Sequence, residues 1–225
     1  MITVVQNHET TMRFSIPLWK RTFDLFCSLI ALAILSPLLL IIGLLIKLDS
    51  KGSIIYISKR AGAGCRVFNF YKFRTMRIGA EGELESLKKS LNQYGEDTDN
   101  QSDAVFVKLK KDPRVTRLGK FLRKTSLDEL PQLYNIIKGD MSIVGNRPLP
   151  LYEAEQLLKD DPTAQRFQAP AGLTGLWQVR RRGQTNMSEE ERKNLDNEYA
   201  QNYSFIMDIK LILQTLKVFV QKESV

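Results

Sequence analysis

Two adjacent carboxylates, Asp128 and Glu129, lie in the densest cluster of apolar and charged residues in this 225-residue sequence, the segment RKTSLDELP. An Asp-Glu pair flanked by cations suits phosphoryl transfer, because a carboxylate can attack phosphorus or hold a divalent metal while Arg or Lys neutralises the phosphate oxygens. The reference pKa of aspartate is ~3.9, so Asp128 is expected to be ionised at neutral pH. Taken singly, a basic residue is more often a solvated surface charge than a ligand. The cations that we expect around the pair are Lys72, Arg74, Arg123 and Arg147.

The same segment has a purely structural interpretation. Ser126 and Glu129 match a capping box, in which the two side chains bond to the first backbone N–H groups of a helix. Pro131 argues against it, because a proline deep in a helix removes a backbone hydrogen bond, whereas a proline at the first helical position is well tolerated. In that second arrangement the two carboxylates precede the helix and can point into a site.

The rare residues exclude several kinds of catalysis. His8 is the one histidine, in a polar N-terminal stretch, so Ser-His-Asp or Cys-His catalysis and histidine-based zinc sites are not expected. Cys27 and Cys65 form no close-spaced motif, which argues against a disulfide framework and fits a reducing compartment. The net charge of +8, with 33 Lys and Arg against 25 Asp and Glu, favours anionic partners such as nucleic acid, phosphorylated metabolites or acidic lipids.

One apolar stretch could enter a membrane. Leu25 to Ile46 contains 22 residues without a charge, and as a helix it would be ~33 Å long against a hydrocarbon core of ~30 Å. Ser36-Pro37 divides it into two arms, because proline removes a backbone donor and disfavours helical angles at the residue before it. Basic residues stand on both sides, which favours a re-entrant segment with both ends in the cytoplasm. A kinked helix that spans the bilayer is the alternative.

The remaining pattern predicts an α+β fold, a mostly helical monotopic membrane protein with a short β-hairpin and surface amphipathic helices. We divide the chain into a flexible N-terminus (1–19), a re-entrant membrane helix (20–48) and a cytoplasmic-face catalytic domain (49–225). The elements expected in the last part are strands at 54–57 and 67–71, a helix at 81–91, a mobile loop at about 92–103, a helix at 149–168 and two helices within 186–222. The last helix either contributes to the core or lies on the bilayer surface.

Five segments of the chain resemble successive blocks of the bacterial sugar transferases, the monotopic polyprenyl-phosphate phosphoglycosyl transferases. They are KRTFDLFCSLIALAILSPLLL, RAGAGCRVFNFYKFRTM, KDPRVTRLGKFLRKTSLDELPQLYNIIKGDMSIVGNRP, PAGLTGLWQV and YSFIMDIKLILQTLKVF. The resemblance runs from about Lys20 to Phe219, and the block from 111 to 148 is highly specific. No segment resembles the extra multi-span module of larger members, so the small single-domain form is expected.

The resemblance implies a reaction and a cofactor. Asp128 falls on the family nucleophile, which attacks the sugar-bearing phosphorus of a UDP-sugar, releases UMP and leaves a phosphosugar on the enzyme. Glu129 falls on its partner, which assists metal binding and the second step, in which polyprenyl (undecaprenyl) phosphate displaces Asp128. Two steps through one covalent intermediate imply ping-pong kinetics. The family uses Mg²⁺, which we expect at Asp128 together with Glu129.

The resemblance also implies how substrates and the membrane are bound. Arg123 and Arg147 match cations near the phosphates, and Lys72 and Arg74 match the basic stretch beside them. Ser36-Pro37 matches the break at which the membrane helix returns to the face it left. The implied partners are UDP-sugar, polyprenyl phosphate and membrane lipid, with no nucleic acid and with a homo-oligomer left open. The implied location is the cytoplasmic face of the bacterial inner membrane, at the first membrane step of glycoconjugate assembly.

The chain departs from the family pattern in two places. Asn146 precedes Arg147 where the family usually has Pro-Arg-Pro, and Ala171 lies in a segment that is usually Arg-Pro-Gly. The first departure touches the expected phosphate loop, and the second lies near the substrate end.

Two non-enzymatic alternatives remain open. The residue pattern of the segment VTRLGKFLRKTSLDELPQLYNII resembles a helix-turn-helix, and the net charge is positive. The chain could therefore be a membrane-tethered nucleic-acid-binding protein. Pro131 argues against this, because it would disrupt the recognition helix. The other alternative is a non-catalytic membrane scaffold that recruits partners through its basic face.

Overall fold

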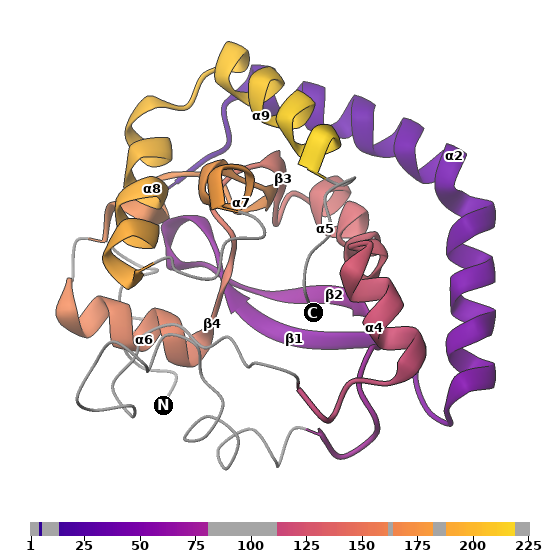
Figure 1. Ribbon diagram of the computed structural model, residues 1–225. Helices are drawn as coiled ribbons and strands as arrows, with labels where there is room; N and C mark the ends of the chain where they lie inside the picture. The colour runs from indigo at the N-terminus through magenta and orange to yellow at the C-terminus, as the bar shows by residue number, and fades with distance from the viewer. Residues whose placement is uncertain (1–4, 6–13, 81–111, 162–163, 182–187, 219–225) are drawn as a thin grey trace.

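The computed structural model describes Val5 and residues 14–80, 112–161, 164–181 and 188–218 (Figure 1). The expected helix at 81–91, the expected loop at 92–103 and most of the expected flexible N-terminus lie outside the described residues. Over the described part, the protein is mostly helical with a small sheet and one long apolar N-terminal helix. This agrees with the predicted α+β class.

The long helix α2 runs from Leu18 to Asp49. Among the described residues it is the one helix long and apolar enough to cross a membrane. Pro37 lies inside it, and Ser36 Oγ donates to the carbonyl of Ala33 at 2.9 Å. Figure 1 shows α2 changing direction about halfway along, from a course across the top of the molecule to a course down its side. A proline inside a helix produces such a bend, because it removes one backbone bond and crowds the preceding turn.

Both arms of α2 pack on the rest of the chain. The first arm contributes Ala31 and Leu35 to the core cluster around Ile136, and the second contributes Ile42 and Ile46 to the cluster around Phe73 and Leu122. The opposite side of the helix is apolar and exposed. Its most exposed large residues are Leu18, Phe26, Leu29, Ile34, Leu40, Ile41, Leu44 and Leu48.

The N-terminal end of α2 is held by buried polar contacts. The ammonium of Lys20 pairs with the carboxylate of Asp208, and the Tyr199 hydroxyl lies within hydrogen-bond distance of that carboxylate at 2.8 Å. Asp24 Oδ1 accepts from the backbone N–H of Ile143 at 3.0 Å. Lys20 and Asp208 are both about 1% exposed, so this end of α2 is fixed to the domain by charges removed from water.

The expected hairpin is confirmed, with longer strands. Strands β1 (Ile55–Ala61) and β2 (Val67–Phe73) pair antiparallel around the short helix η1 (Ala63–Cys65). Strand β4 (Leu149–Pro150) adds to the other edge of β1. Phe68, Phe70 and Phe73 are buried, so the hairpin forms part of the core.

A second, two-stranded sheet pairs β3 (Ser142–Val144) with β5 (Gly172–Thr174) in parallel. Glycines allow the two chains to approach closely. A Cβ on Gly145 would lie 2.2 Å from the carbonyl oxygen of Pro170, and one on Gly172 would lie 2.1 Å from the N of Gly145. The sequence did not reveal these short strands, which bring the segment after β3 to a fixed place beside the hairpin.

The helices around the two sheets follow the chain in order. They are α4 (Arg117–Lys124), η4 (Leu127–Glu129), α5 (Gln132–Lys138), α6 (Leu151–Asp160), η5 (Gln165–Gln168), α7 (Leu176–Arg181), α8 (Glu189–Asn202) and α9 (Phe205–Val218). The single helix expected at 149–168 was wrong, because α6 ends at Asp160 and η5 is separate. Asp161 precedes Pro162, and a residue before proline disfavours the helical conformation.

The two helices expected within 186–222 are present as α8 and α9. Helix α9 lies beside the first arm of α2 (Figure 1), and the ring of Phe205 makes edge contacts with Trp19 at 5.8 Å and Phe23 at 5.7 Å. Leu211 is buried, whereas Ile206 is 67% exposed. Helix α9 therefore contributes to the core with one side and continues the exposed apolar surface of α2 with the other.

Candidate active site

The carboxylate pair lies in a tight turn between α4 and α5. Ser126 has a left-handed backbone (φ 53°) and its side chain makes no capping bond, so the capping box does not form. Pro131 stands directly before the first residue of α5. Asp128 and Glu129 therefore precede the helix in the short turn η4, which is the second of the two predicted arrangements.

Two cations from distant parts of the chain bind Glu129. The ammonium of Lys72, at the end of β2, lies 2.7 Å from Glu129 Oε1, and Arg147 Nη2 donates to the same oxygen at 2.6 Å. Arg147 Nη1 lies 3.5 Å from Oε2. The side chain of Glu129 is 15% exposed, so these ion pairs are largely shielded from solvent.

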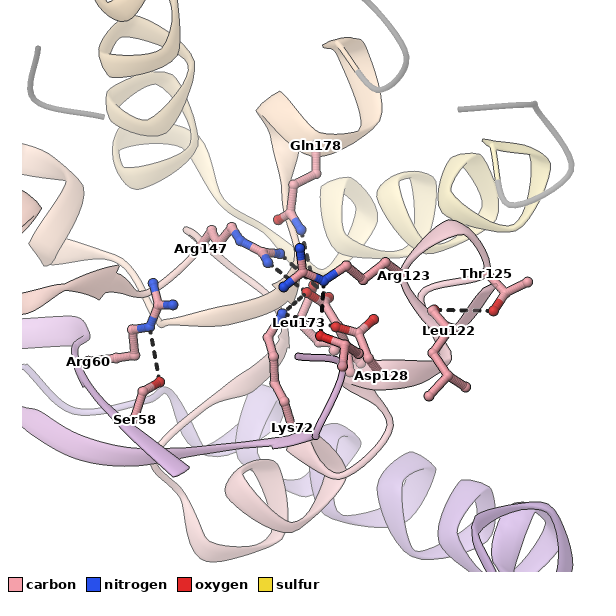
Figure 2. A network of polar contacts seen from close by, with 12 residues as sticks. Ser58, Arg60, Lys72, Leu122, Arg123, Thr125, Asp128, Arg147, Leu173 and Gln178 are labelled. Carbon is pink, nitrogen blue, oxygen red and sulfur yellow. Dashed lines mark hydrogen bonds and ion pairs between the residues drawn. The ribbon is translucent and has the colours of Figure 1, made fainter. Parts of the chain in front are cut away.

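Asp128 is more buried and less firmly paired. Its side chain is 8% exposed, and its Oδ2 lies 3.5 Å from the Lys72 ammonium. Arg123 lies near enough to Asp128 to attract it, while Arg123 Nε donates to Thr75 Oγ1 at 3.0 Å. Figure 2 shows the side chains of Lys72, Arg123 and Arg147 converging around Asp128. The structure thus brings together five of the six predicted site residues.

The surroundings shift the pKa values of the two carboxyl groups in opposite directions. Burial alone would raise the pKa of Glu129, but the charges and hydrogen bonds of Arg147 and Lys72 outweigh it and hold that pKa well below its usual range. Burial raises the pKa of Asp128, and the negative charge of Glu129 adds to this against the opposing effect of Lys72 and Arg123. The anionic form of Glu129 is thus favoured, whereas the burial of Asp128 removes much of the water around its carboxylate, which favours its reactivity.

The sixth predicted residue, Arg74, lies elsewhere. Its Nη2 donates to the carbonyl of Ser50 and its Nη1 to the carbonyl of Lys51, both at 2.7 Å. Those carbonyls follow the C-terminus of α2, where a cation is favoured by the helix dipole. The structure therefore does not place Arg74 beside the carboxylates, and its observed contacts hold the end of α2 against β2.

Two further residues near the site were not predicted. Arg60, on β1, shares a sheet face with Lys72 because Tyr56 pairs with Lys72 and alternate residues point the same way. The sequence pattern ended the first strand at residue 57, and a longer alternating strand would have revealed it. Gln178, on α7, donates from Nε2 to the carbonyl of Leu173 at 3.2 Å (Figure 2), and its Oε1 is buried without a partner among the described residues.

The departures from the family pattern have structural roles here. Asn146 Nδ2 donates to the carbonyls of Arg166 at 3.0 Å and Asp196 at 2.9 Å, and its backbone pairs with Ala171. The side chain therefore ties together the loops behind the site, while the neighbouring Arg147 reaches Glu129. Ala171 is buried against Phe68 and Phe70, where a small apolar side chain is accommodated.

The two carboxylates, Asp128 and Glu129, differ in how well they could bind a metal ion. Among the described residues, no group of three or more Asp, Glu, His or Cys side chains could hold one. Mg²⁺ needs only one or two carboxylates, however, when substrate phosphates complete its shell. Asp128 has the right chemistry and no close hydrogen-bonded cation, whereas Glu129 would have to release Lys72 or Arg147. Asp128 therefore fits Mg²⁺, and Glu129 fits it only after a rearrangement.

Together, the fold and the site define a mostly helical domain that joins a long apolar helix to a buried, cation-lined carboxylate pair. A family model described as bacterial sugar transferase matches residues 16–222. The chain belongs to the bacterial sugar transferase family.

Similar proteins carry related names. The chain is 39% identical over 225 residues to the undecaprenyl-phosphate galactose phosphotransferase of Salmonella typhimurium, covering 99% of this chain and 44% of that protein. It is 36% identical to an uncharacterised sugar transferase of Haemophilus influenzae, covering 99% and 45%. It is 41% identical over 197 residues to the exopolysaccharide production protein ExoY of Sinorhizobium fredii, covering 88% and 83%. The chain spans less than half the length of the first two of these relatives.

Proposed function

We propose that this chain is a phosphoglycosyl transferase that moves a sugar-1-phosphate from a UDP-sugar to polyprenyl phosphate, with UMP as the second product. The observation that carries the proposal is Asp128, a buried carboxylate that faces Lys72 and Arg123 at the turn before α5. The name of the Salmonella relative, an undecaprenyl-phosphate galactose phosphotransferase, supports the choice of acceptor and reaction class. A glycan pathway such as exopolysaccharide assembly is consistent with the name of the ExoY relative.

The proposed reaction has two balanced steps. In the first, a carboxylate oxygen of Asp128 attacks the sugar-bearing phosphorus, the bond from that phosphorus to the bridging oxygen breaks, and UMP leaves with the electron pair. In the second, an oxygen of polyprenyl phosphate attacks the same phosphorus, and the bond to Asp128 breaks to regenerate the carboxylate. The two half-reactions share one covalent intermediate and give ping-pong kinetics. Neither step requires a histidine.

The other residues of the site have supporting roles in this mechanism. Lys72 and Arg147 neutralise phosphate oxygens, and Arg favours bidentate contact with phosphate. Glu129 holds both cations in place, so it acts as a positioning residue in the observed arrangement. Mg²⁺, held by Asp128 and the donor's phosphates, would reduce the repulsion between the carboxylate and the diphosphate. The positive charge of Arg123 attracts Asp128 and lowers the free-energy cost of its buried negative charge.

The proposal is tested by mixing the purified chain with a panel of UDP-sugars in Mg²⁺-containing detergent. Without acceptor, we expect the preferred donor to release about one UMP per enzyme molecule, as a covalent intermediate requires. Adding polyprenyl phosphate should convert this burst into continuous turnover, and a chelator in excess of Mg²⁺ should suppress both. A scaffold or a nucleic-acid-binding protein would release no UMP from any donor.

The proposed location is a membrane surface, with α2 entering and leaving the same face. Both arms of α2 contact one domain, through Ala31 and Leu35 on the first and Ile42 and Ile46 on the second. A helix that crossed the bilayer would carry one arm away from these contacts. Such a segment places the site at the plane where the acceptor's phosphate lies, and the acceptor's lipid cannot leave the bilayer without losing about 0.8 kcal/mol per buried methylene.

Cysteine labelling tests this topology. We expect Ser15→Cys and Ser53→Cys, at exposed positions just outside the two ends of α2, to resist a membrane-impermeant maleimide in intact cells when Cys27 and Cys65 are replaced by Ala. Both should react after lysis, because both ends are expected in the cytoplasm. Labelling of Ser15→Cys alone in intact cells would show a spanning helix, and Ser53→Cys is the matched control for access.

The nucleic-acid alternative finds little support in the segment that suggested it. Helix α5 has seven residues, and Gln132, Leu133, Asn135 and Ile136 are buried in the domain. Four of the seven side chains of α5 are therefore unavailable for contact with bases. Salt-dependent retention on duplex DNA measures this directly, and the transferase proposal expects weak retention.

A further inference from the structure

Charged side chains form a row across the site, and their signs alternate along only part of it. Lys72 lies between Asp128 at 3.5 Å and Glu129 at 2.7 Å, and Glu129 in turn binds Arg147 at 2.6 Å. Beyond Arg147 the row continues with Arg60 (Figure 2). At this end the two cations Arg147 and Arg60 are neighbours, and the buried carboxylate of Glu153 attracts both of them.

Arg60 lies over an aromatic ring of the sheet, and no described carboxylate forms an ion pair with it. Its Cζ lies 5.2 Å from the ring centroid of Phe70, and the Lys72 ammonium lies 5.5 Å from the same ring, so one aromatic side chain supports both cations. The one hydrogen bond of the Arg60 side chain among the described residues is a long one, from Nε to Ser58 Oγ at 3.5 Å. A guanidinium has five N–H donors, so most of its binding capacity is unused.

The surroundings of Arg60 favour an anion. Burial and the charge of Arg147 lower the pKa of the Arg60 guanidinium, and the weaker attraction of Glu153 does not compensate for them. No ion pair joins Arg60 to a carboxylate in the described part of the chain. Two neighbouring, partly desolvated arginines gain free energy when a phosphate comes between them, since the anion removes their repulsion and accepts charge-assisted hydrogen bonds.

We propose that Arg60 binds the phosphate of the departing nucleotide, so that the donor's diphosphate lies across the site from Asp128 to the space between Arg147 and Arg60. This inference rests on the proposed function. The attacking oxygen and the leaving oxygen must stand on opposite sides of the sugar-bearing phosphorus. Asp128 lies at one end of the row and Arg60 at the other, so the end with Arg60 is the position of the leaving group.

This position gives Arg60 a defined part in the first step. When the bridging bond breaks, its electron pair goes to the leaving phosphate, which becomes the UMP dianion. Arg60 and Arg147 donate to the oxygens that gain this charge, and no proton is required. Lys72 and Arg123, which face Asp128, remain with the phosphate that becomes bound to the enzyme.

The test compares nucleotide affinities of the full-length chain in detergent. Wild-type protein should bind UMP more tightly than uridine, and Arg60→Gln should weaken UMP binding by about 10- to 100-fold while leaving uridine binding unchanged, as loss of a charge-assisted hydrogen bond implies. Arg60→Lys should fall between them, because it keeps the charge but loses the planar fork. Lys59→Gln, an exposed cation on the same strand with the opposite orientation, should bind UMP like wild type.

Equal UMP affinity in wild type and Arg60→Gln would overturn the inference, and so would a wild-type protein that does not distinguish UMP from uridine. Failure of the proposed function has a separate signature, the absence of any covalent phosphosugar on wild-type protein with every UDP-sugar. The melting temperatures of all variants are measured to verify that they fold. If Arg60→Gln is unstable, Arg60→Lys serves as the second variant, because it retains a cation beside the ring of Phe70.

Discussion

Asp128→Asn is expected to abolish the covalent phosphosugar and to lower UMP release by at least about 10⁴-fold, the scale of loss found when an enzyme's nucleophile is removed. Asparagine has nearly the same shape as aspartate but carries no anionic oxygen to attack phosphorus. The measurement is intact-protein mass after mixing with the preferred UDP-sugar, together with UMP quantified in the supernatant. Turnover close to that of wild type would show that Asp128 is not the nucleophile.

The stability of this variant provides a control. Because burial raises the pKa of Asp128 above its ordinary value, the charged form costs folding free energy at neutral pH. Removal of the charge should leave the melting temperature unchanged or raise it slightly. A loss of activity with a large drop in melting temperature would instead indicate a structural role.

The same shift gives a pH dependence. Adduct formation requires ionised Asp128, so its rate should fall as the pH is lowered through the raised pKa, which lies above the usual range for aspartate. The pKa of Glu129 is depressed, so Glu129 stays ionised throughout this fall and keeps Lys72 and Arg147 in place.

The second large effect is on stability. Lys20→Met is expected to lower the free energy of unfolding by about 3–5 kcal/mol, because it leaves the buried carboxylate of Asp208 without its counterion. For a domain of this size the melting temperature would fall by roughly 10 °C. Thermal unfolding in detergent measures the change. The destabilisation arises because the Asp208 carboxylate stays buried without a counterion. Its size should therefore depend on whether residue 208 is charged.

The matched variants separate these causes. Lys20→Met/Asp208→Asn removes both charges and should recover much of the lost stability, since no unpaired ion remains in the interior. Lys59→Met alters an exposed lysine on β1 and should change stability by less than about 0.5 kcal/mol. If Lys20→Met is as mild as Lys59→Met, the contact with Asp208 does not anchor α2.

Local features of the chain could be predicted from the sequence because neighbouring residues create them. The apolar stretch with Pro37 forms the bent helix α2, and the β-rich segments around residues 55–73 form the hairpin. The adjacent Asp128 and Glu129 lie before α5 because Pro131 cannot sit deeper in it. In each case residues close together in the sequence determine the local conformation of the backbone.

The sequence alone determined that a carboxylate pair, a set of cations and one long apolar helix belong to this protein. Only the tertiary structure decided which cations meet the pair. Lys72 and Arg147 reach Glu129 across 57 and 18 residues of chain, whereas Arg74, two residues from Lys72, binds the end of α2. Arg60 joins the site through the register of β1 against β2. The physical reason is that an ion pair depends on distance in space, which strand register and the packing of helices set and which spacing along the chain does not.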